Sequence, residues 1–453
     1  MRETATIAAP ATAPGQAGVA IIRVSGPNAL SVLQGCFFHR GRLEPRRMVY
    51  GTVTLAGEPV DRALAVYFQA PKSYTGEDMA EIHCHGGQET VRAVLQAVMA
   101  AGAIAAEPGE FSKRAFLNGR MDLSQAEAVM DLISARAEGA RKLALRQLEG
   151  RLGRKVTEIQ DELLSLLAEI EVTVDYPEDD LEQHTAHDVA RRLAGVGEQL
   201  EELLRTARAG RALREGVRCA IVGRPNAGKS SLLNALLGED RAIVTARPGT
   251  TRDTLDAEAS IGGIPVTFVD TAGIRHAGDE IEAMGVERAK KALAQASLAR
   301  LVVDGAAGVT NDDRQILKEA GDTPVIVVVS KADLALAVTA EEAADLLQCR
   351  GAVAVSALTG GGMAALQTMI EECCAGGEGF AESAALSNAR HIEAVRDGAD
   401  AVRQAIEALG EGYPPDTAAT DIRRAWHALG QVTGKTVDED VIDLIFERFC
   451  LGK

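Results

Sequence analysis

The pattern of apolar positions changes along the chain. Up to about residue 118, short apolar runs such as Val19–Val24 and Leu64–Phe68 alternate with Gly and Pro turns, which predicts an α+β domain. From about residue 122 the spacing becomes helical, and the apolar residues of 163–174 share one helix face. The segment 176–180 breaks this helix, and a second helix is predicted through roughly 187–212.

Residues 216–379 then alternate between strand and helix patterns. The predicted strands are near-continuous apolar runs, which are typical of parallel strands buried on both faces. They are Val217–Val222, Val266–Val269, Leu301–Val303, Val325–Val329 and Ala352–Val355. Helical spacing returns after about residue 383, so the pattern predicts a multidomain chain with a doubly wound α/β domain inserted into an all-α domain. The expected domain ranges are 1–118, 119–215, 216–379 and 380–453.

Composition narrows the class of protein. The chain has 453 residues, 46% of them hydrophobic and 25% charged, as in soluble globular proteins. A net charge of −17 argues against a protein that coats nucleic acids in general. Two groups of arginines remain candidates for a local RNA-binding patch, although a solvent-exposed charged surface is the commoner explanation for such groups. These groups are Arg40, Arg42, Arg46 and Arg47, and Arg208, Arg211, Arg214 and Arg218. Seven cysteines without a CxxC pair argue against a disulfide framework. No apolar run approaches the ~20 residues that span a bilayer, so we expect a cytoplasmic protein without a membrane partner.

One segment carries a strong chemical signal. Gly223–Ser230 satisfies the pattern G-x-x-x-x-G-K-S, after a predicted strand and before a predicted helix at Ser231–Leu237. Glycines allow backbone N–H groups to surround phosphates, a lysine reaches the terminal phosphates, and a serine hydroxyl ligates Mg²⁺. The sequence therefore predicts a phosphate loop with Lys229 and Ser230 in these roles.

Four later segments identify the base. Thr250-Thr251 offers a second Mg²⁺ hydroxyl from Thr251, and Asp270–Gly273 follows a strand and would contact Mg²⁺ and the γ-phosphate. Ser330–Asp333 follows another strand, and the Asp333 carboxylate can accept two N–H groups that guanine has and adenine lacks. Ser356-Ala357 would offer a backbone N–H to the guanine oxygen. Their order at the ends of successive strands favours GTP over ATP.

This set resembles the translation-factor class of GTPases, with two departures. Ser330 stands where Asn usually contacts the guanine ring and ties the base loop to the phosphate loop. Ser is shorter and offers less, so we expect a nucleotide affinity weaker by about 0.5–1.5 kcal/mol. Ile274 stands where Ras-type enzymes have the Gln that orients water. Arg252 and Arg275 are equally well explained as surface residues, so no arginine finger is evident.

The whole chain resembles the MnmE (TrmE) family of bacterial tRNA-modification GTPases. The resemblance includes the final Phe449–Lys453 motif, which other GTPases lack. The other matching stretches are Thr6–Ala9, Ile21–Gly26, Tyr74–Asp78, His85–Gly87, Gly109–Ser112, Ala115–Asn118, Arg224–Ala227 and Gly249–Asp253.

The resemblance implies a fold and a GTP site. It implies an N-terminal folate-binding and dimerising domain, then a helical domain interrupted by the GTPase (G) domain. In the family, K⁺ takes the place of an arginine finger, and its ligands map to Asn226, Thr245, Arg247 and Thr250. The water-orienting Glu maps to Glu282. The expected GTP contacts are Asn226, Ala227, Gly228, Lys229, Ser230, Ser231, Thr245, Ala246, Arg247, Pro248, Gly249, Thr250, Thr251, Asp270, Thr271, Ala272, Gly273, Ser330, Lys331, Asp333, Ser356, Ala357 and Leu358.

Both ends of the chain carry further candidates. Arg23 and Glu81 suit a folate, whose pterin a carboxylate can grip, but from the residues alone an internal salt bridge is the favoured explanation. By resemblance the folate contacts are Arg23, Glu81, Arg120 and Lys453, with Arg120 where Lys is common, and the ligand is 5,10-methylenetetrahydrofolate or 5-formyltetrahydrofolate.

Three cysteine and histidine positions complete the candidates. His83 and His85 share a strand face, yet no third metal ligand is visible. Cys450 is a catalytic candidate by resemblance, and a small packing residue otherwise.

The resemblance also implies a reaction and partners. A homodimer, joined to the FAD-binding GidA (MnmG) protein in a heterotetramer, would add a carboxymethylaminomethyl or aminomethyl group to carbon 5 of the wobble uridine of certain tRNAs. Hydrolysis of GTP, dependent on K⁺ and on G-domain dimerisation, would drive a conformational change. The alternatives are a regulatory GTPase of ribosome assembly without chemistry of its own, and a folate enzyme with a vestigial GTPase.

Overall fold

The computed structural model forms two compact units. It describes residues 5–175, 179–239, 257–269, 293–294, 296–321, 323–349, 351–375 and 385–453. Unit 1 comprises Met1–Met130, Leu148–Ala168 and Arg423–Lys453, and unit 2 comprises Asp131–Gln147 and Glu169–Ile422. We describe each unit by itself.

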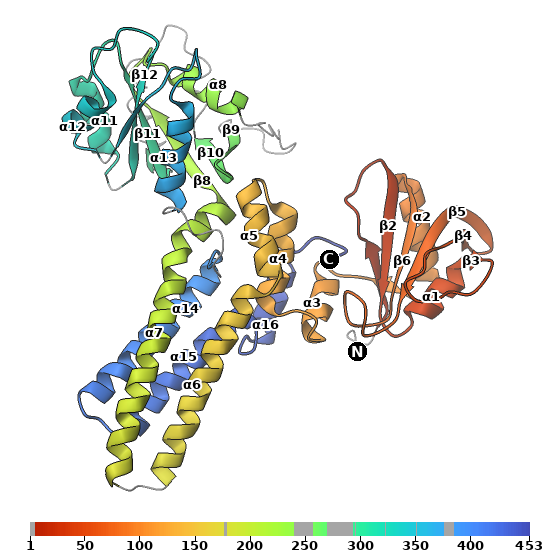
Figure 1. Ribbon diagram of the computed structural model, residues 1–453. Coiled ribbons are helices and arrows are strands. Elements are labelled where there is room, and N and C mark those ends of the chain that lie inside the picture. The colour runs from red at the N-terminus through yellow and green to blue at the C-terminus, as the bar shows by residue number, and fades with distance from the viewer. Residues whose placement is uncertain are drawn as a thin grey trace. The chain divides into compact units, whose positions relative to one another are not determined.

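Unit 1 contains a seven-stranded sheet in the order β3-β4-β5-β6-β2-β1-β7. Neighbouring strands are antiparallel except β1 and β7, which are parallel. The strands are β1 (Ile7–Pro10), β2 (Ala17–Ser25), β3 (Phe37–His39), β4 (Val49–Leu55), β5 (Glu58–Phe68), β6 (Met79–Gly86) and β7 (Ile104–Ala105). Helices α1 (Ala29–Cys36) and α2 (Gln88–Ala100) cover one face, because alternate apolar residues of the strands point toward them (Figure 1).

Unit 2 contains a six-stranded sheet in the order β13-β12-β11-β8-β10-β9. All neighbours are parallel except β9 and β10, which form an antiparallel hairpin. The strands are β8 (Val217–Val222), β9 (Ala257–Ile261), β10 (Ile264–Val269), β11 (Leu298–Asp304), β12 (Val325–Ser330) and β13 (Ala352–Ala354). The helices around it are α8 (Lys229–Glu239), α11 (Asn311–Glu319), α12 (Ala340–Leu347) and α13 (Met363–Ala375). Separate apolar clusters bury the two faces of the sheet, as doubly wound folds require.

The remaining elements are helices. They are α3 (Glu110–Leu117), α4 (Leu123–Ser134), α5 (Glu138–Leu148), α6 (Arg151–Asp175), α7 (Asp179–Glu215), α14 (Ala389–Gly410), α15 (Pro415–Thr433) and α16 (Glu439–Phe446). Helix α7 leads directly into β8, and the chain returns from the sheet beside α7, where Leu386 N–H donates to Thr206 Oγ1 (3.0 Å). It then enters α14, which packs along α7 (Figure 1).

The predicted fold class is therefore confirmed. An α+β N-terminal part, a helical part and an inserted α/β P-loop part are all present. The five predicted strands of the α/β part match β8, β10, β11, β12 and β13, whereas β9 was not predicted. The domain ranges expected from the sequence stay a prediction.

Candidate functional site

The phosphate loop follows β8 and leads into α8. Gly223 and Gly228 have φ of 148° and 96°, in the region that favours glycine, and Asn226 also has a positive φ of 61°. A side chain at Gly223 would place its Cβ 2.4 Å from the Val302 carbonyl oxygen, so this position also needs the close approach that glycine allows. The backbone thus has the tight curvature expected of a loop that binds phosphates.

Lys229 lies against the loop that precedes it. Its Nζ donates to the carbonyl oxygens of Gly223 (2.8 Å) and Arg224 (2.6 Å). Burial lowers the pKa of Lys229 from its ordinary value. A phosphate would therefore supply an anionic partner to a partly buried ammonium group that here contacts neutral carbonyl groups.

Arg224 fixes the same loop to the segment that follows β11. Its Nε donates to Asp313 Oδ1 (3.2 Å), and its Nη2 donates to the Gly308 carbonyl oxygen (3.0 Å). Asp313 is fully buried and also accepts from the N–H and hydroxyl of Thr310 at the start of α11. The phosphate loop is therefore held by a charged pair that joins Arg224 of the motif to Asp313 outside it.

Ser330 ends β12 and connects the base loop to the phosphate loop. Its hydroxyl lies 2.5 Å from the Ala227 carbonyl oxygen, with the Val303 carbonyl at 3.1 Å. The shorter side chain therefore still joins the base loop to the phosphate loop. A weaker contact with the guanine ring stays a prediction.

The residues predicted to read the base gather at the same edge of the sheet. Ser356 Oγ donates to Asp333 Oδ1 (2.6 Å), which orients the carboxylate expected to bind guanine. Lys331 has a positive φ of 58°, and its Nζ lies 2.6 Å from Asp304 Oδ2. This contact, more than any other, lowers the pKa of Asp304. Ala357 and Leu358 follow on the adjacent loop, where Leu358 is exposed.

Part of the predicted site lies outside the described residues. Ser230 and Ser231 are described in the first turn of α8. The candidates outside the described residues are Thr245, Ala246, Arg247, Pro248, Gly249, Thr250, Thr251, Asp270, Thr271, Ala272, Gly273 and Glu282.

A second cluster forms in unit 1, on neighbouring strands. Arg23 on β2 faces Glu81 on β6, and Arg23 Nε donates to Glu81 Oε1 (3.0 Å). The guanidinium carbon of Arg23 lies 5.3 Å from the Tyr74 ring centroid and 5.8 Å from that of Phe111. The internal salt bridge that the residues alone suggested is therefore present, and the folate contact stays a prediction.

The end of the chain joins this cluster. Arg23 Nη1 donates to the Gly452 carbonyl oxygen (3.2 Å), and Gly452 has a φ of 87°. A Cβ at Gly452 would lie 2.1 Å from the Pro10 carbonyl oxygen, so only glycine allows the tail to lie this close to β1. Burial, and then the charge of Arg23, lower the pKa of Lys453, whereas Glu81 and Cys450 act in the opposite direction. Three predicted folate residues and Cys450 are thus brought together.

The fourth folate candidate lies apart from these contacts. Arg120 is exposed beside Gly76, and within the described residues no hydrogen bond or ion pair joins it to the cluster. The Cys450 side chain is also exposed, while its carbonyl oxygen accepts from Gly109 N–H (3.4 Å). The tail therefore leaves the thiol accessible in this unit.

The two strand histidines have carboxylate neighbours. His85 Nδ1 lies 2.8 Å from Asp61 Oδ1, and His83 Nε2 lies 3.5 Å from Glu81 Oε2. Between them Cys84 is buried on the opposite face, which raises its pKa to about 11. Across the described parts of the chain, no group of three or more such side chains has a metal-binding arrangement.

Sequence reasoning missed several supporting residues. Tyr74 and Phe111 flank Arg23, and Arg224, Asp304 and Asp313 hold the nucleotide loops. A carboxylate that follows a buried strand, as Asp304 does, is a recognisable signal at a sheet edge. The two aromatic residues had no such signal, because only the fold brings them to β2.

Among the described helices, none is long and apolar enough to cross a membrane.

These features define a P-loop GTPase domain inserted into a helical protein. Two family models match the chain, the "GTP-binding protein TrmE N-terminus" over residues 6–120 and the "MnmE helical domain" over residues 123–450. The chain therefore belongs to the MnmE family of tRNA modification GTPases, as the sequence resemblance predicted.

Full-length relatives agree with this assignment. Proteins from Roseiflexus castenholzii and Symbiobacterium thermophilum are each 46% identical, and one from Heliobacterium modesticaldum is 43% identical. In each case the alignment covers 99% of this chain and 99% of the relative, and each relative carries the name "tRNA modification GTPase MnmE".

Proposed function

We propose that this chain hydrolyses GTP to drive modification of the wobble uridine of certain tRNAs at carbon 5. The observation that carries the proposal is the convergence of the phosphate loop, Ser330 and Asp333 at one sheet edge, where Ser330 bridges two of the loops. Phosphates bind at such an edge, and the Asp333 carboxylate matches the paired N–H groups of guanine.

We further propose two cations at this site. Ser230 and Thr251 would ligate Mg²⁺, and Asn226, Thr245, Arg247 and Thr250 would ligate K⁺. The described residues fit this role, because Asn226 is exposed at the centre of the loop and offers an amide oxygen, which suits a hard cation. A fixed cation stabilises charge that develops on the phosphates, and Glu282 would orient the attacking water. Hydrolysis at equal rates in K⁺ and in Na⁺ would exclude the K⁺ site.

We propose that the cluster in unit 1 binds a reduced folate. Arg23, Glu81 and Lys453 lie together with two aromatic rings, which suits a ligand with a pterin and carboxylates. Arg120 would reach the same ligand from the adjacent loop. When bound, 5,10-methylenetetrahydrofolate or 5-formyltetrahydrofolate supplies the one-carbon unit that becomes the methylene of the product.

Cys450 is proposed to act on the substrate beside this cluster. Its thiol is exposed, and its carbonyl oxygen accepts from the Lys453 N–H (3.3 Å). Cys450→Ser is expected to abolish tRNA modification and to leave GTP hydrolysis unchanged. Normal levels of the modified nucleoside in this variant would exclude the role.

The proposed assembly is a homodimer with an FAD-binding GidA (MnmG) partner in a heterotetramer. The face of the N-terminal sheet opposite α1 and α2 supports a dimer, because Phe38, Tyr50 and Leu64 are 60%, 62% and 40% exposed there. Exposed apolar patches of this kind mark interfaces. We place the assembly in the cytoplasm, with tRNA as its substrate.

The function is tested by mass spectrometry of tRNA nucleosides from cells that lack the chain. We expect the carboxymethylaminomethyl or aminomethyl group to disappear from the wobble uridine and to return with the wild-type gene. Unchanged wobble uridine would contradict the proposal and would favour a regulatory GTPase of ribosome assembly.

A further inference from the structure

The β9–β10 hairpin contacts the start of α5, away from both sites described above. Gly139, the second residue of α5, donates its N–H to the carbonyl oxygen of Gly263 in the hairpin turn (3.0 Å). Arg136, just before α5, lies with its Nη1 2.5 Å from Glu258 Oε1 on β9. All four residues belong to unit 2. We call this set the hairpin contact.

The hairpin contact is tight and directional. An added Cβ on Gly139 would lie 2.5 Å from the Gly263 oxygen and 2.7 Å from Leu213 Cδ2. The first N–H groups of a helix have no partner within the helix, so the Gly263 carbonyl satisfies a group that α5 itself cannot. Movement of the hairpin therefore either breaks this bond or carries the start of α5 with it.

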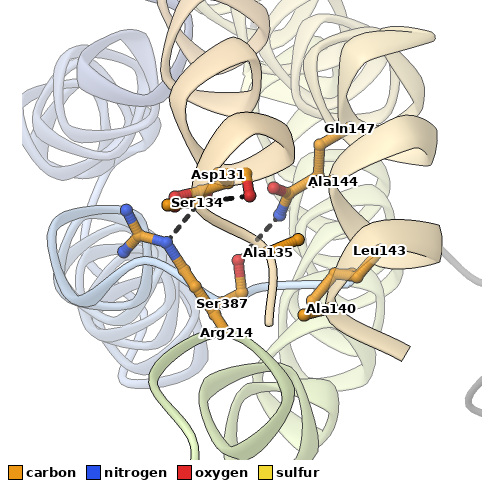
Figure 2. A pocket seen from close by; sticks show the side chains of 9 residues that line it. All are labelled: Asp131, Ser134, Ala135, Ala140, Leu143, Ala144, Gln147, Arg214 and Ser387. Carbon is orange, nitrogen blue, oxygen red and sulfur yellow. Dashed lines mark hydrogen bonds and ion pairs between the residues drawn. The ribbon is translucent and has the colours of Figure 1, made fainter. Parts of the chain in front are cut away.

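Helix α5 in turn lies where both connections to the inserted domain meet. Arg214, at the end of α7, donates to Asp131 Oδ2 of α4 (2.8 Å). Gln147, near the end of α5, donates to Ser387 Oγ (2.9 Å) just before α14 (Figure 2). The cavity among these side chains measures about 20 Å³, room for about one water molecule. This close packing leaves little space for α5 to move independently of α7 and the return segment.

The β9–β10 hairpin is flanked in the sequence by residues predicted to lie at the nucleotide site. Strand β9 begins at Ala257, soon after Thr251, and β10 ends at Val269, next to Asp270. Thr251 is one of the proposed Mg²⁺ ligands, and Asp270 is expected from the sequence to contact Mg²⁺. We propose that the hairpin contact transmits the nucleotide state of the G domain to the helices through α5. This inference rests on the proposed function, in which hydrolysis drives chemistry elsewhere in the chain.

Glycine variants test the contact with a matched control. Gly139→Ala introduces the Cβ that meets Gly263, whereas Gly195→Ala places the same change in α7, where the added Cβ meets no atom within 4 Å apart from the backbone of its own helix. With the full chain, its FAD-binding partner, tRNA and folate, we expect Gly139→Ala to keep GTP hydrolysis within about twofold of wild type and to lose modification at least about tenfold. Gly195→Ala is expected to match wild type in both assays. The inference falls when Gly139→Ala matches Gly195→Ala, or when it lowers hydrolysis and modification by the same factor.

Charge reversal gives a readout that a loss of packing would not produce. Arg136 and Glu258 are 55% and 33% exposed, so their ion pair contributes little to folding and each single variant should fold. We expect Arg136→Glu and Glu258→Arg each to lower modification about fivefold at unchanged GTP hydrolysis, and the double variant to recover it. A double variant no better than the single variants would overturn the inference.

The two proposals fail in different ways. If the wild-type assembly hydrolyses GTP and forms no modified nucleoside, the proposed function falls and this inference falls with it. If the wild-type assembly modifies tRNA and the variants at Gly139, Arg136 and Glu258 do so equally well, only the inference falls.

Discussion

The nucleotide site and the N-terminal cluster are built in different ways. The nucleotide site uses backbone curvature at Gly223 and Gly228 and short loops at the ends of parallel strands. The N-terminal cluster uses charged side chains, and Arg23 reaches Gly452 across 429 positions of the sequence. The first is therefore made of short loops that the parallel strands of one sheet bring to the same edge, such as Ser330 beside Ala227, and the second is complete only when the tail is docked. The comparison indicates that each site can be disabled while the other is left intact.

The largest expected effect is at the phosphate loop. Lys229→Ala removes the ammonium group that would neutralise the terminal phosphates, so we expect GTP hydrolysis to fall by about 1,000-fold or more. A steady-state GTPase assay measures it, with Lys142→Ala on the exposed face of α5 as the control. Hydrolysis in Lys229→Ala at the rate of the control would contradict the assignment of the loop.

A smaller effect is expected at the base. Asp333→Asn replaces a carboxylate that accepts two N–H groups, and charged hydrogen bonds contribute about 1.5–3 kcal/mol, so GTP affinity should fall roughly 10- to 100-fold. Xanthosine triphosphate, which carries an oxygen in place of the amino group of guanine, should bind more tightly than GTP. Calorimetric titration with both nucleotides checks this, with Asp345→Asn on exposed α12 as the control. Unchanged preference for GTP would remove Asp333 from the base site.

A change in the C-terminal tail is expected to lower tRNA modification and to leave GTP hydrolysis unchanged. Gly452→Ala would place a Cβ 2.1 Å from the Pro10 oxygen, so the tail should leave β1 and tRNA modification should fall about tenfold, with GTP hydrolysis unchanged. Gly412→Ala is the matched control, because Gly412 has a φ of 84°, close to the 87° of Gly452, and open space around it. Loss of hydrolysis in Gly452→Ala would show that the two regions are not separable.

The smallest effect concerns the bridge between loops. Ser330→Ala removes one hydrogen bond to the Ala227 carbonyl, which contributes about 0.5–1.5 kcal/mol, so GTP affinity should fall roughly 2- to 10-fold. Ser330→Asn restores the usual residue and should bind GTP more tightly than wild type. If Ser330→Asn binds no better, then Ser330 already supplies what the usual Asn does.

The two regions also differ in how far the sequence predicts them. The phosphate loop and the base loops are short segments that follow apolar strands, so spacing alone predicted their chemistry and their shared edge. Strand β9 was missed because Ala257–Ile261 alternates small and polar residues without a strong apolar pattern. The tie that Ser330 makes to Ala227 could not be foreseen, because residue type gives no distance between two loops. The docking of Gly452 beside Arg23 depends on tertiary packing, and only the family resemblance pointed to it.

The central claim is that hydrolysis in one region drives chemistry in the other. The most direct measurement is mass spectrometry of the wobble uridine in a reconstituted reaction that contains this chain, its FAD-binding partner, folate and tRNA, with either GTP or a non-hydrolysable analogue. The account predicts the modified nucleoside with GTP and none with the analogue. Equal yields with both nucleotides would contradict it.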